Sequence, residues 1–156
     1  MESKKILLVE DNPNDVELTK RALQKSNVSN ELIIAGDGVE ALNYFFGQDG
    51  KSGCSIETLP VIVLLDLKLP KMGGLQVLRQ IRANEKTKMI PVAIFTSSNE
   101  EKDIINSYNL GANSYIRKPI KFVEFAEAIS QLGLYWLVLN LPAPNSEQNY
   151  KRKNQP

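Results

Sequence analysis

The sequence predicts an α/β fold in which helices cover both faces of a doubly wound, five-stranded parallel sheet. Short runs made only of apolar residues recur along the chain, as expected for parallel strands that are buried on both sides. Segments with the apolar spacing of amphipathic helices lie between these runs. This alternation favours a parallel sheet whose strands are joined by right-handed crossovers.

The predicted strands follow one another at intervals that leave room for a helix between them. In chain order they are residues 6–9, 32–35, 61–65, 92–95 and 114–116, of which the second and the last have the weaker signals. The stretch 47–59 is polar and contains three glycines, so we expect a loop before the third strand.

Four helices have recognisable signals. Asn12 and Pro13 are typical of an N-cap followed by proline at the first helical position, and this helix extends to about Ser26. Another helix follows Gly74, and the next ends at residues 109–111. The last carries an apolar stripe that Trp136 continues; its members are Phe122, Phe125, Ala126, Ile129 and Gly133.

Composition limits the classes of function. The net charge is +1, which gives no overall field for nucleic acid or a membrane surface, and we find no stretch as long as a membrane span. The single cysteine, Cys54, excludes an intrachain disulfide and fits a reducing compartment, so we expect a cytoplasmic protein. The chain contains no histidine, which excludes histidine catalysis, histidine metal ligation and an internal histidine phosphodonor.

Chemically active residues stand where the predicted strands end. Glu10 and Asp11 follow the first strand, Asp66 follows the third, Thr96 ends the fourth, and Lys118 follows the fifth. The carboxyl ends of parallel strands share one edge of the sheet, where ligands bind in such folds. Each residue alone has an ordinary explanation as a cap or a turn residue, but their joint occurrence indicates a site.

The residue types indicate phosphoryl chemistry with a metal ion. Three carboxylates repel one another unless a cation joins them, and a donor set made only of oxygen favours Mg²⁺. A carboxylate beside the metal can act as a nucleophile toward phosphorus. An ammonium group and a hydroxyl would help to neutralise the oxygens of the transferred group.

The sequence resembles the response regulator receiver domains of two-component signalling over about residues 4–132. The matching segments are Ile6-Leu7-Leu8-Val9-Glu10-Asp11-Asn12, Leu64-Leu65-Asp66-Leu67-Lys68-Leu69-Pro70-Lys71-Met72-Gly73-Gly74, Phe95-Thr96-Ser97-Ser98, Gly111-Ala112 and Tyr115-Ile116-Arg117-Lys118-Pro119. The resemblance implies a flavodoxin-like sheet with strand order 2-1-3-4-5. It also implies a Mg²⁺-dependent phosphoacceptor that takes its phosphoryl group from a sensor histidine kinase.

The resemblance assigns the phosphoryl group to Asp66. Asp11, Asp66 and the backbone carbonyl of Lys68 would hold Mg²⁺, and Glu10 would hold it through water. Lys118 would pair first with Asp66 and then with the phosphoryl group.

The resemblance also implies two moving residues and one special peptide bond. Thr96 would move to the phosphoryl group and Tyr115 would swing inward behind it. The Lys118–Pro119 peptide bond would be cis. Two departures from the common pattern stand out: Gly73 replaces an acidic residue, and Lys68 and Ser98 occupy positions that can alter the lifetime of the phosphoryl group.

A receiver domain with a C-terminal helical extension from about residue 133 is expected over residues 1–141, with a flexible tail over 142–156. The extension is apolar nearly all round, which favours a homodimer, while folding back over its own domain is the alternative. The loop 47–59 and the ending Leu134-Tyr135-Trp136-Leu137 resemble single-domain regulators of phytochrome-type kinases.

Two other functions stay open at this point. An aspartate-nucleophile phosphatase usually places a second Asp two residues after the nucleophile, where this chain has Lys68. A receiver-like binding module that is never phosphorylated is the other. We expect a switch rather than a turnover enzyme, with output through protein contact or phosphorelay and none through nucleic acid or membrane.

Overall fold

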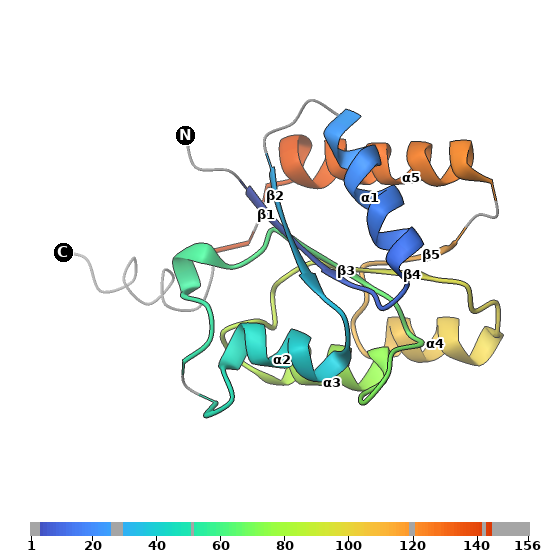
Figure 1. Cartoon of the computed structure of the whole chain (residues 1–156). Coiled ribbons are helices and arrows are strands. Elements are labelled where there is room, and N and C mark those ends of the chain that lie inside the picture. The colour runs from blue at the N-terminus through green and yellow to red at the C-terminus, as the bar shows by residue number, and fades with distance from the viewer. Residues whose placement is uncertain (1–3, 26–29, 51, 119–120, 142, 145–156) are drawn as a thin grey trace.

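The computed structural model describes residues 4–25, 30–50, 52–118, 121–141 and 143–144. Five parallel strands form one sheet in the order β2-β1-β3-β4-β5 (Figure 1). The strands are β1 (Lys4–Val9), β2 (Asn30–Ala35), β3 (Ile62–Leu65), β4 (Val92–Thr96) and β5 (Ser114–Arg117). The predicted fold class and strand order are confirmed, and every predicted strand is present with ends that differ by at most two residues.

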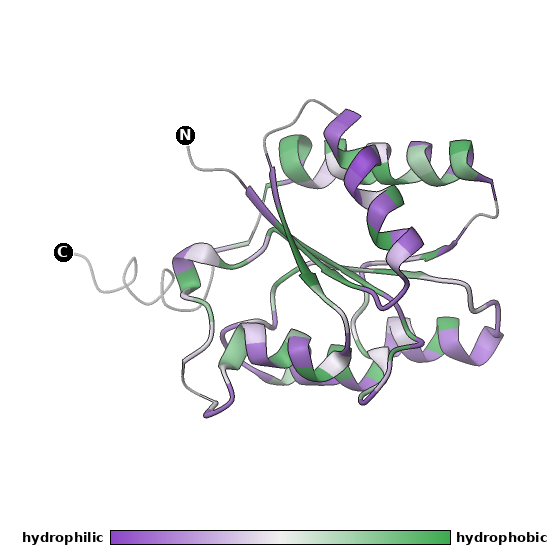
Figure 2. Ribbon diagram, in the orientation of Figure 1, coloured by the Kyte–Doolittle hydropathy of each residue, from purple (hydrophilic) through white to green (hydrophobic). Residues whose placement is uncertain are grey.

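Helices cover both faces of the sheet. They are α1 (Pro13–Lys25), α2 (Gly38–Phe46), α3 (Gly74–Ala83), α4 (Glu101–Asn109) and α5 (Phe122–Leu134). Helices α1 and α5 lie on one face and α2, α3 and α4 lie on the other (Figure 1). The strands are hydrophobic along most of their length, while α1 carries many hydrophilic residues and α5 is mostly hydrophobic (Figure 2). Successive strand residues therefore enter two separate cores.

The core beneath α1 and α5 positions the C-terminal helix. Ile6, Leu8 and Leu64 point into it from the sheet. Phe95 of β4 meets Phe125 of α5 edge to face, with ring centroids 5.1 Å apart. The other core, around Phe45, packs α2 and α3 on the opposite face.

Helix α2 has no counterpart among the four helices expected from the sequence. Asp37 is its N-cap and accepts a hydrogen bond from the Glu40 backbone N–H at 2.8 Å. The Glu40 carboxylate in turn accepts from the Gly36 N–H at 2.9 Å. The arrangement is similar to a capping box, except that Glu40 accepts from the residue before the N-cap, and it starts the helix without any proline signal. The expected loop after α2 contains one short 3₁₀ turn, Ile56–Thr58.

The C-terminal extension leaves the α-helical path. After α5 the chain forms a π-helical turn, η2 (Tyr135–Leu139), in which the Asn140 N–H donates to the Tyr135 carbonyl at 2.7 Å. Leu137 is only 2% exposed and packs beside Gly133, whose own missing side chain leaves room for Leu23. The Lys4 ammonium donates to the Leu137 carbonyl and so joins β1 to η2.

One residue of the expected stripe on α5 is exposed. Phe125, Ile129 and Gly133 are buried as expected, but Phe122 is 43% exposed. It lies at the first position of the helix, beyond the edge of the core, and the Lys25 ammonium sits 5.7 Å from its ring centroid. The expected tail, residues 142–156, lies outside the described residues except for 143–144.

The expectation that no stretch reaches the length of a membrane span needs correction. The 18 residues Phe122–Leu139 are long and apolar enough by length and composition alone. Core helices of soluble proteins also meet this criterion, and Phe125, Ile129 and Leu137 supply apolar contacts to the domain core. Ala126, Leu132 and Trp136 are partly buried against the same core. The exposed large apolar residues of the stretch are Phe122, Val123, Leu134, Tyr135, Val138 and Leu139.

Candidate functional site

Strand pairing brings the three carboxylates together. The Asp66 N–H donates to the Val9 carbonyl at 3.1 Å, which continues the pairing of β3 with β1. The Glu10 N–H donates to the Ala35 carbonyl of β2 at 3.0 Å. Carboxylate oxygens of Glu10, Asp11 and Asp66 consequently lie within 4.8 Å of one another. Glu10 and Asp66 are buried, whereas Asp11 is exposed at the mouth of the site.

Lys118 and Thr96 contact Asp66 from the neighbouring strands. The Lys118 N–H donates to the Thr96 carbonyl at 2.7 Å, so β4 fixes the start of the lysine side chain. Its ammonium donates to Asp66 Oδ2 at 2.9 Å, to Asp15 Oδ2 at 2.8 Å and to Glu10 Oε1. Thr96 Oγ1 donates to Asp66 Oδ1 at 2.7 Å. Both oxygens of Asp66 are thus hydrogen-bonded.

Burial and close contact shift the pKa values of Glu10, Asp66 and Lys118. Burial raises the pKa of Glu10 to about 8, and its hydrogen bond with Asp66 adds to the effect. Burial alone would raise the pKa of Asp66, but hydrogen bonds with Glu10, Lys118 and Thr96 outweigh it and hold that pKa below its usual value. Burial would lower the pKa of Lys118, yet its carboxylate partners raise it above the ordinary value. The pKa values of these two neighbouring carboxyl groups are thus shifted in opposite directions, that of Glu10 upward and that of Asp66 downward.

Tyr115 lies next to the site but is not in contact with Asp66. Its hydroxyl donates to the Ser98 carbonyl at 3.0 Å, and burial raises its pKa. Ser98 Oγ in turn donates to Asp103 Oδ2 of α4 at 2.6 Å. Tyr115 and Ser98 thus connect β5 to the loop before α4.

Lys68 meets the site through its backbone. Its N–H donates to Asp66 Oδ1 at 3.1 Å, and its side chain is exposed. The expected cis bond before Pro119 lies outside the described residues, because Pro119 is not among them.

Asp15 is the site residue that the sequence analysis missed. It lies in the first turn of α1, and no local sequence signal identifies its contact with Lys118, a residue 103 positions away. The structure places it against Lys118, whose ammonium donates to Asp15 Oδ2.

The donor set fits a hard divalent cation. The cluster of Glu10, Asp11 and Asp66 offers only oxygen atoms, which suits Mg²⁺ or Mn²⁺. Asp11 leaves one side of the cluster open to solvent, so a cation that keeps some of its water molecules can be accommodated there.

Comparison with known proteins agrees with this geometry. The model of the response regulator receiver domain matches residues 6–130. The chain belongs to this family. It is a receiver domain of two-component signalling, in which receivers work with histidine kinases.

Relatives of this receiver domain include phytochrome-associated regulators. Response regulator Rcp1 of Synechocystis sp. is 39% identical over 141 residues, 90% of this chain and 94% of Rcp1. The Mn²⁺-bound form of Rcp1 superposes with a TM-score of 0.81, at 34% identity, over 90% of this chain and 99% of that one.

Two further solved structures extend the similarity. The phosphorylated cyanobacterial phytochrome response regulator RcpA gives a TM-score of 0.84 at 35% identity, over 92% of this chain and 100% of RcpA. The bacteriophytochrome response regulator RtBRR is 46% identical, with a TM-score of 0.69, over 97% of this chain and 91% of RtBRR. The expected resemblance to phytochrome-associated regulators is therefore confirmed.

Proposed function

We propose that this receiver domain is a phosphorylation switch in which Asp66 accepts a phosphoryl group from a sensor histidine kinase in a Mg²⁺-dependent reaction. The observation that carries the proposal is the environment of Asp66, which contacts a lysine ammonium and a threonine hydroxyl beside an acidic cluster. The phosphorylated state of the relative RcpA supports it.

The transfer exchanges one bond to phosphorus for another. An oxygen of Asp66 forms a bond to phosphorus while the bond from phosphorus to the kinase imidazole nitrogen breaks, and the imidazole leaves with the electron pair. A bound Mg²⁺ would offset the charge on the phosphoryl oxygens. Asp11, Asp66 and the Lys68 carbonyl would hold the ion, and Glu10 would hold it through water.

The other residues act on the phosphoryl group after transfer. The Lys118 ammonium, now on Asp66 Oδ2, would donate to a phosphoryl oxygen. Thr96 would turn its hydroxyl from Asp66 to the same group. Tyr115 would then lose its bond to Ser98 and swing toward the space that Thr96 leaves. These changes would shift an equilibrium between two conformations.

We propose a switch rather than a turnover enzyme. A phosphatase of the aspartate-nucleophile type needs an acid two residues after the nucleophile, and Lys68 with its exposed ammonium stands there instead. At most, slow self-dephosphorylation is expected. Multiple turnovers on a phosphomonoester would favour the phosphatase, and failure of acetyl phosphate to modify the protein would favour an unphosphorylated binding module.

Acetyl phosphate tests the proposal without knowledge of the kinase. With MgCl₂, the intact mass of the protein should increase by one phosphoryl group, and the modification should map to Asp66. Asp66→Asn and a sample with EDTA are the matched controls, and both should stay unmodified. Equal labelling of Asp66→Asn would overturn the assignment of the acceptor.

The proposed partner is a phytochrome-type histidine kinase. The proposed location of this receiver domain is the cytoplasm. Support comes from RcpA and RtBRR, which are respectively a phytochrome and a bacteriophytochrome response regulator. Phosphotransfer from a panel of purified histidine kinases would test the pairing, with the rate for a phytochrome-type kinase expected to exceed the others.

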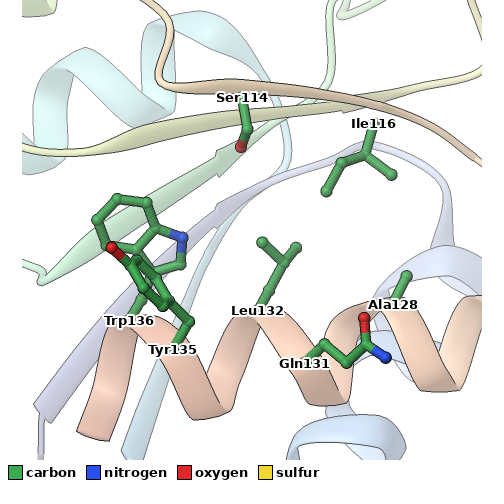
Figure 3. A pocket seen from close by; sticks show the side chains of 7 residues that line it. All are labelled: Ser114, Ile116, Ala128, Gln131, Leu132, Tyr135 and Trp136. Carbon is green, nitrogen blue, oxygen red and sulfur yellow. The ribbon is translucent and has the colours of Figure 1, made fainter. Parts of the chain in front are cut away.

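We also propose that two copies pair through the C-terminal surface. Exposed apolar residues gather there: Leu134, Tyr135, Val138, Leu139 and Leu141. Beside them, Leu132, Tyr135 and Trp136 border an open hollow of about 480 Å³ between α5 and β5 (Figure 3). The Ser114 hydroxyl faces this hollow and, among the described residues, is the buried side-chain group without a hydrogen-bond partner.

Light scattering with and without beryllofluoride tests the pairing. Leu139→Arg should give a monomer, because Leu139 is 66% exposed on η2. Val39→Arg on α2, across the sheet, is the control and should remain paired. A monomeric wild-type protein in both conditions would contradict the proposal.

A further inference from the structure

We propose that Asp15 is a positioning residue that holds the Lys118 ammonium in place during phosphoryl transfer to Asp66. This role deepens the function proposed above and depends on it. The three carboxylates around Lys118 come from three elements: Glu10 follows β1, Asp15 belongs to α1 and Asp66 follows β3. An ammonium has three N–H donors, so these contacts use all of them.

Asp15 differs from the other two partners because it is outside the acidic cluster. Glu10 and Asp66 both belong to the group of carboxylates that can hold a metal ion. A bound cation would attract both and weaken their hold on Lys118. The bond from Lys118 to Asp15, at 2.8 Å, does not compete with that cation.

A lysine head needs such a restraint more than most cations. The ammonium lies at the end of a flexible side chain of four carbons, and its three N–H donors can rotate. The phosphoryl group would take the donor that now points to Asp66 Oδ2. With Asp15 still bound, the ammonium would stay directed at that position rather than turning to solvent.

The fold fixes Asp15 without help from the metal site. Asn12 Oδ1 accepts from the Asn14 N–H at 2.9 Å and from the Asp15 N–H at 3.3 Å, which caps the first turn of α1. Thr19 Oγ1 donates to the Asp15 carbonyl at 2.7 Å. The Asp15 side chain is 22% exposed, so part of it is withdrawn from water.

Substitution of Asp15 tests the proposal through the rate of labelling by acetyl phosphate with Mg²⁺. Asp15→Asn and Asp15→Ala should lower the maximal rate about tenfold, as loss of a supporting contact typically does. The half-saturating concentrations of acetyl phosphate and Mg²⁺ should change far less. Asp15→Glu should recover part of the rate. Glu17→Gln removes the same charge from α1 at an exposed position that pairs with Arg21, and it should label at the wild-type rate.

A double-mutant cycle separates positioning from a general effect on structure. Where Lys118 is already replaced by Ala, Asp15→Ala should cause no further loss of rate. The ¹⁹F spectrum of bound beryllofluoride should also change in Asp15→Ala, since Lys118 would donate to one of its fluorines in place of a phosphoryl oxygen. A full further loss in the double mutant, or an unchanged spectrum with an unchanged rate, would overturn the role of Asp15. Failure of the wild type to label would instead overturn the proposed function.

Discussion

Thr96 Oγ1 donates a hydrogen bond to Asp66 Oδ1 over 2.7 Å, although the two residues are 30 positions apart in the chain. Thr96→Val keeps the shape of the side chain and removes this donor. Because the acceptor is a buried carboxylate, the free energy of unfolding should fall by about 1–3 kcal/mol. Urea denaturation of the metal-free protein measures the loss.

Thr96→Ser is the matched control, because it keeps the hydroxyl and loses one methyl group. The free energy of unfolding of this variant should fall by only ~0.8 kcal/mol, the contribution of one buried carbon. If serine and valine destabilised the protein equally, the hydrogen bond would not contribute as described.

The raised pKa of Glu10 predicts that Mg²⁺ binding releases a proton. An ionised Glu10 attracts the cation and its bound water more strongly than a protonated one, so affinity should rise with pH and level off above about pH 8. Calorimetry in buffers of different ionisation enthalpy counts the released protons. Glu10→Gln should release none, and pH-independent affinity of the wild type would contradict the prediction.

The free energy of unfolding of the metal-free protein should also depend on the protonation of Glu10. The pKa of Glu10 is raised in the folded state from 4.5 to about 8, so its contribution is complete below about pH 4.5 and is lost as the pH rises through about 8. Urea denaturation across this range, with and without saturating Mg²⁺, should show the loss only in the metal-free protein.

Gly74 keeps the chain close to the acceptor strand. A Cβ there would lie 2.2 Å from the Asp66 carbonyl oxygen, so Gly74→Ala must displace the backbone of Asp66. Overpacking of this kind costs about 1–3 kcal/mol, and labelling of Asp66 should slow as well. Urea denaturation and the labelling rate check both effects.

Gly73→Asp is the neighbouring control. Gly73 is the N-cap of α3 in extended conformation, with φ −67°, and a Cβ there comes no closer than 3.8 Å to the Leu67 carbonyl oxygen. Asp is a favoured N-cap residue, so stability should be kept or increased. Comparable damage from both substitutions would contradict the close approach at Gly74.

Substitution of Leu137 tests how much the packing of η2 contributes to the free energy of unfolding. Leu137→Ala should cost about 2–5 kcal/mol, because it empties a buried position under α1. Val138→Ala changes a side chain that is 52% exposed and should stay within about 0.5 kcal/mol of the wild type. Similar thermal midpoints for the two variants would mean that η2 does not pack on the domain.

The site was predictable where it depends on strand ends. In a parallel sheet the residues after neighbouring strands meet at one edge, so Asp66, Thr96 and Lys118 could be grouped from the sequence. Asp15 could not, because its contact with Lys118 depends on how α1 crosses the sheet and joins residues 103 positions apart. Its burial and partner follow from the packing of α1 rather than from local sequence.

The fold was less predictable where apolar residues are dense. Helix α2 has apolar residues on several sides, and its clearest signal was the N-cap residue Asp37 followed three positions later by Glu40. In the C-terminal extension nearly every residue is apolar, so periodicity does not identify the inner face. The π-helical turn also changes the spacing, and Leu137 rather than Trp136 becomes fully buried.

The bond between the Lys4 ammonium and the Leu137 carbonyl has a consequence for synthesis of the chain. Leu137 leaves the ribosome 133 residues after Lys4. Until then, the apolar side chains of Ile6 and Leu23 lack the cover that α5 and η2 provide. The nascent chain therefore has a prolonged stage in which this surface is available to chaperones.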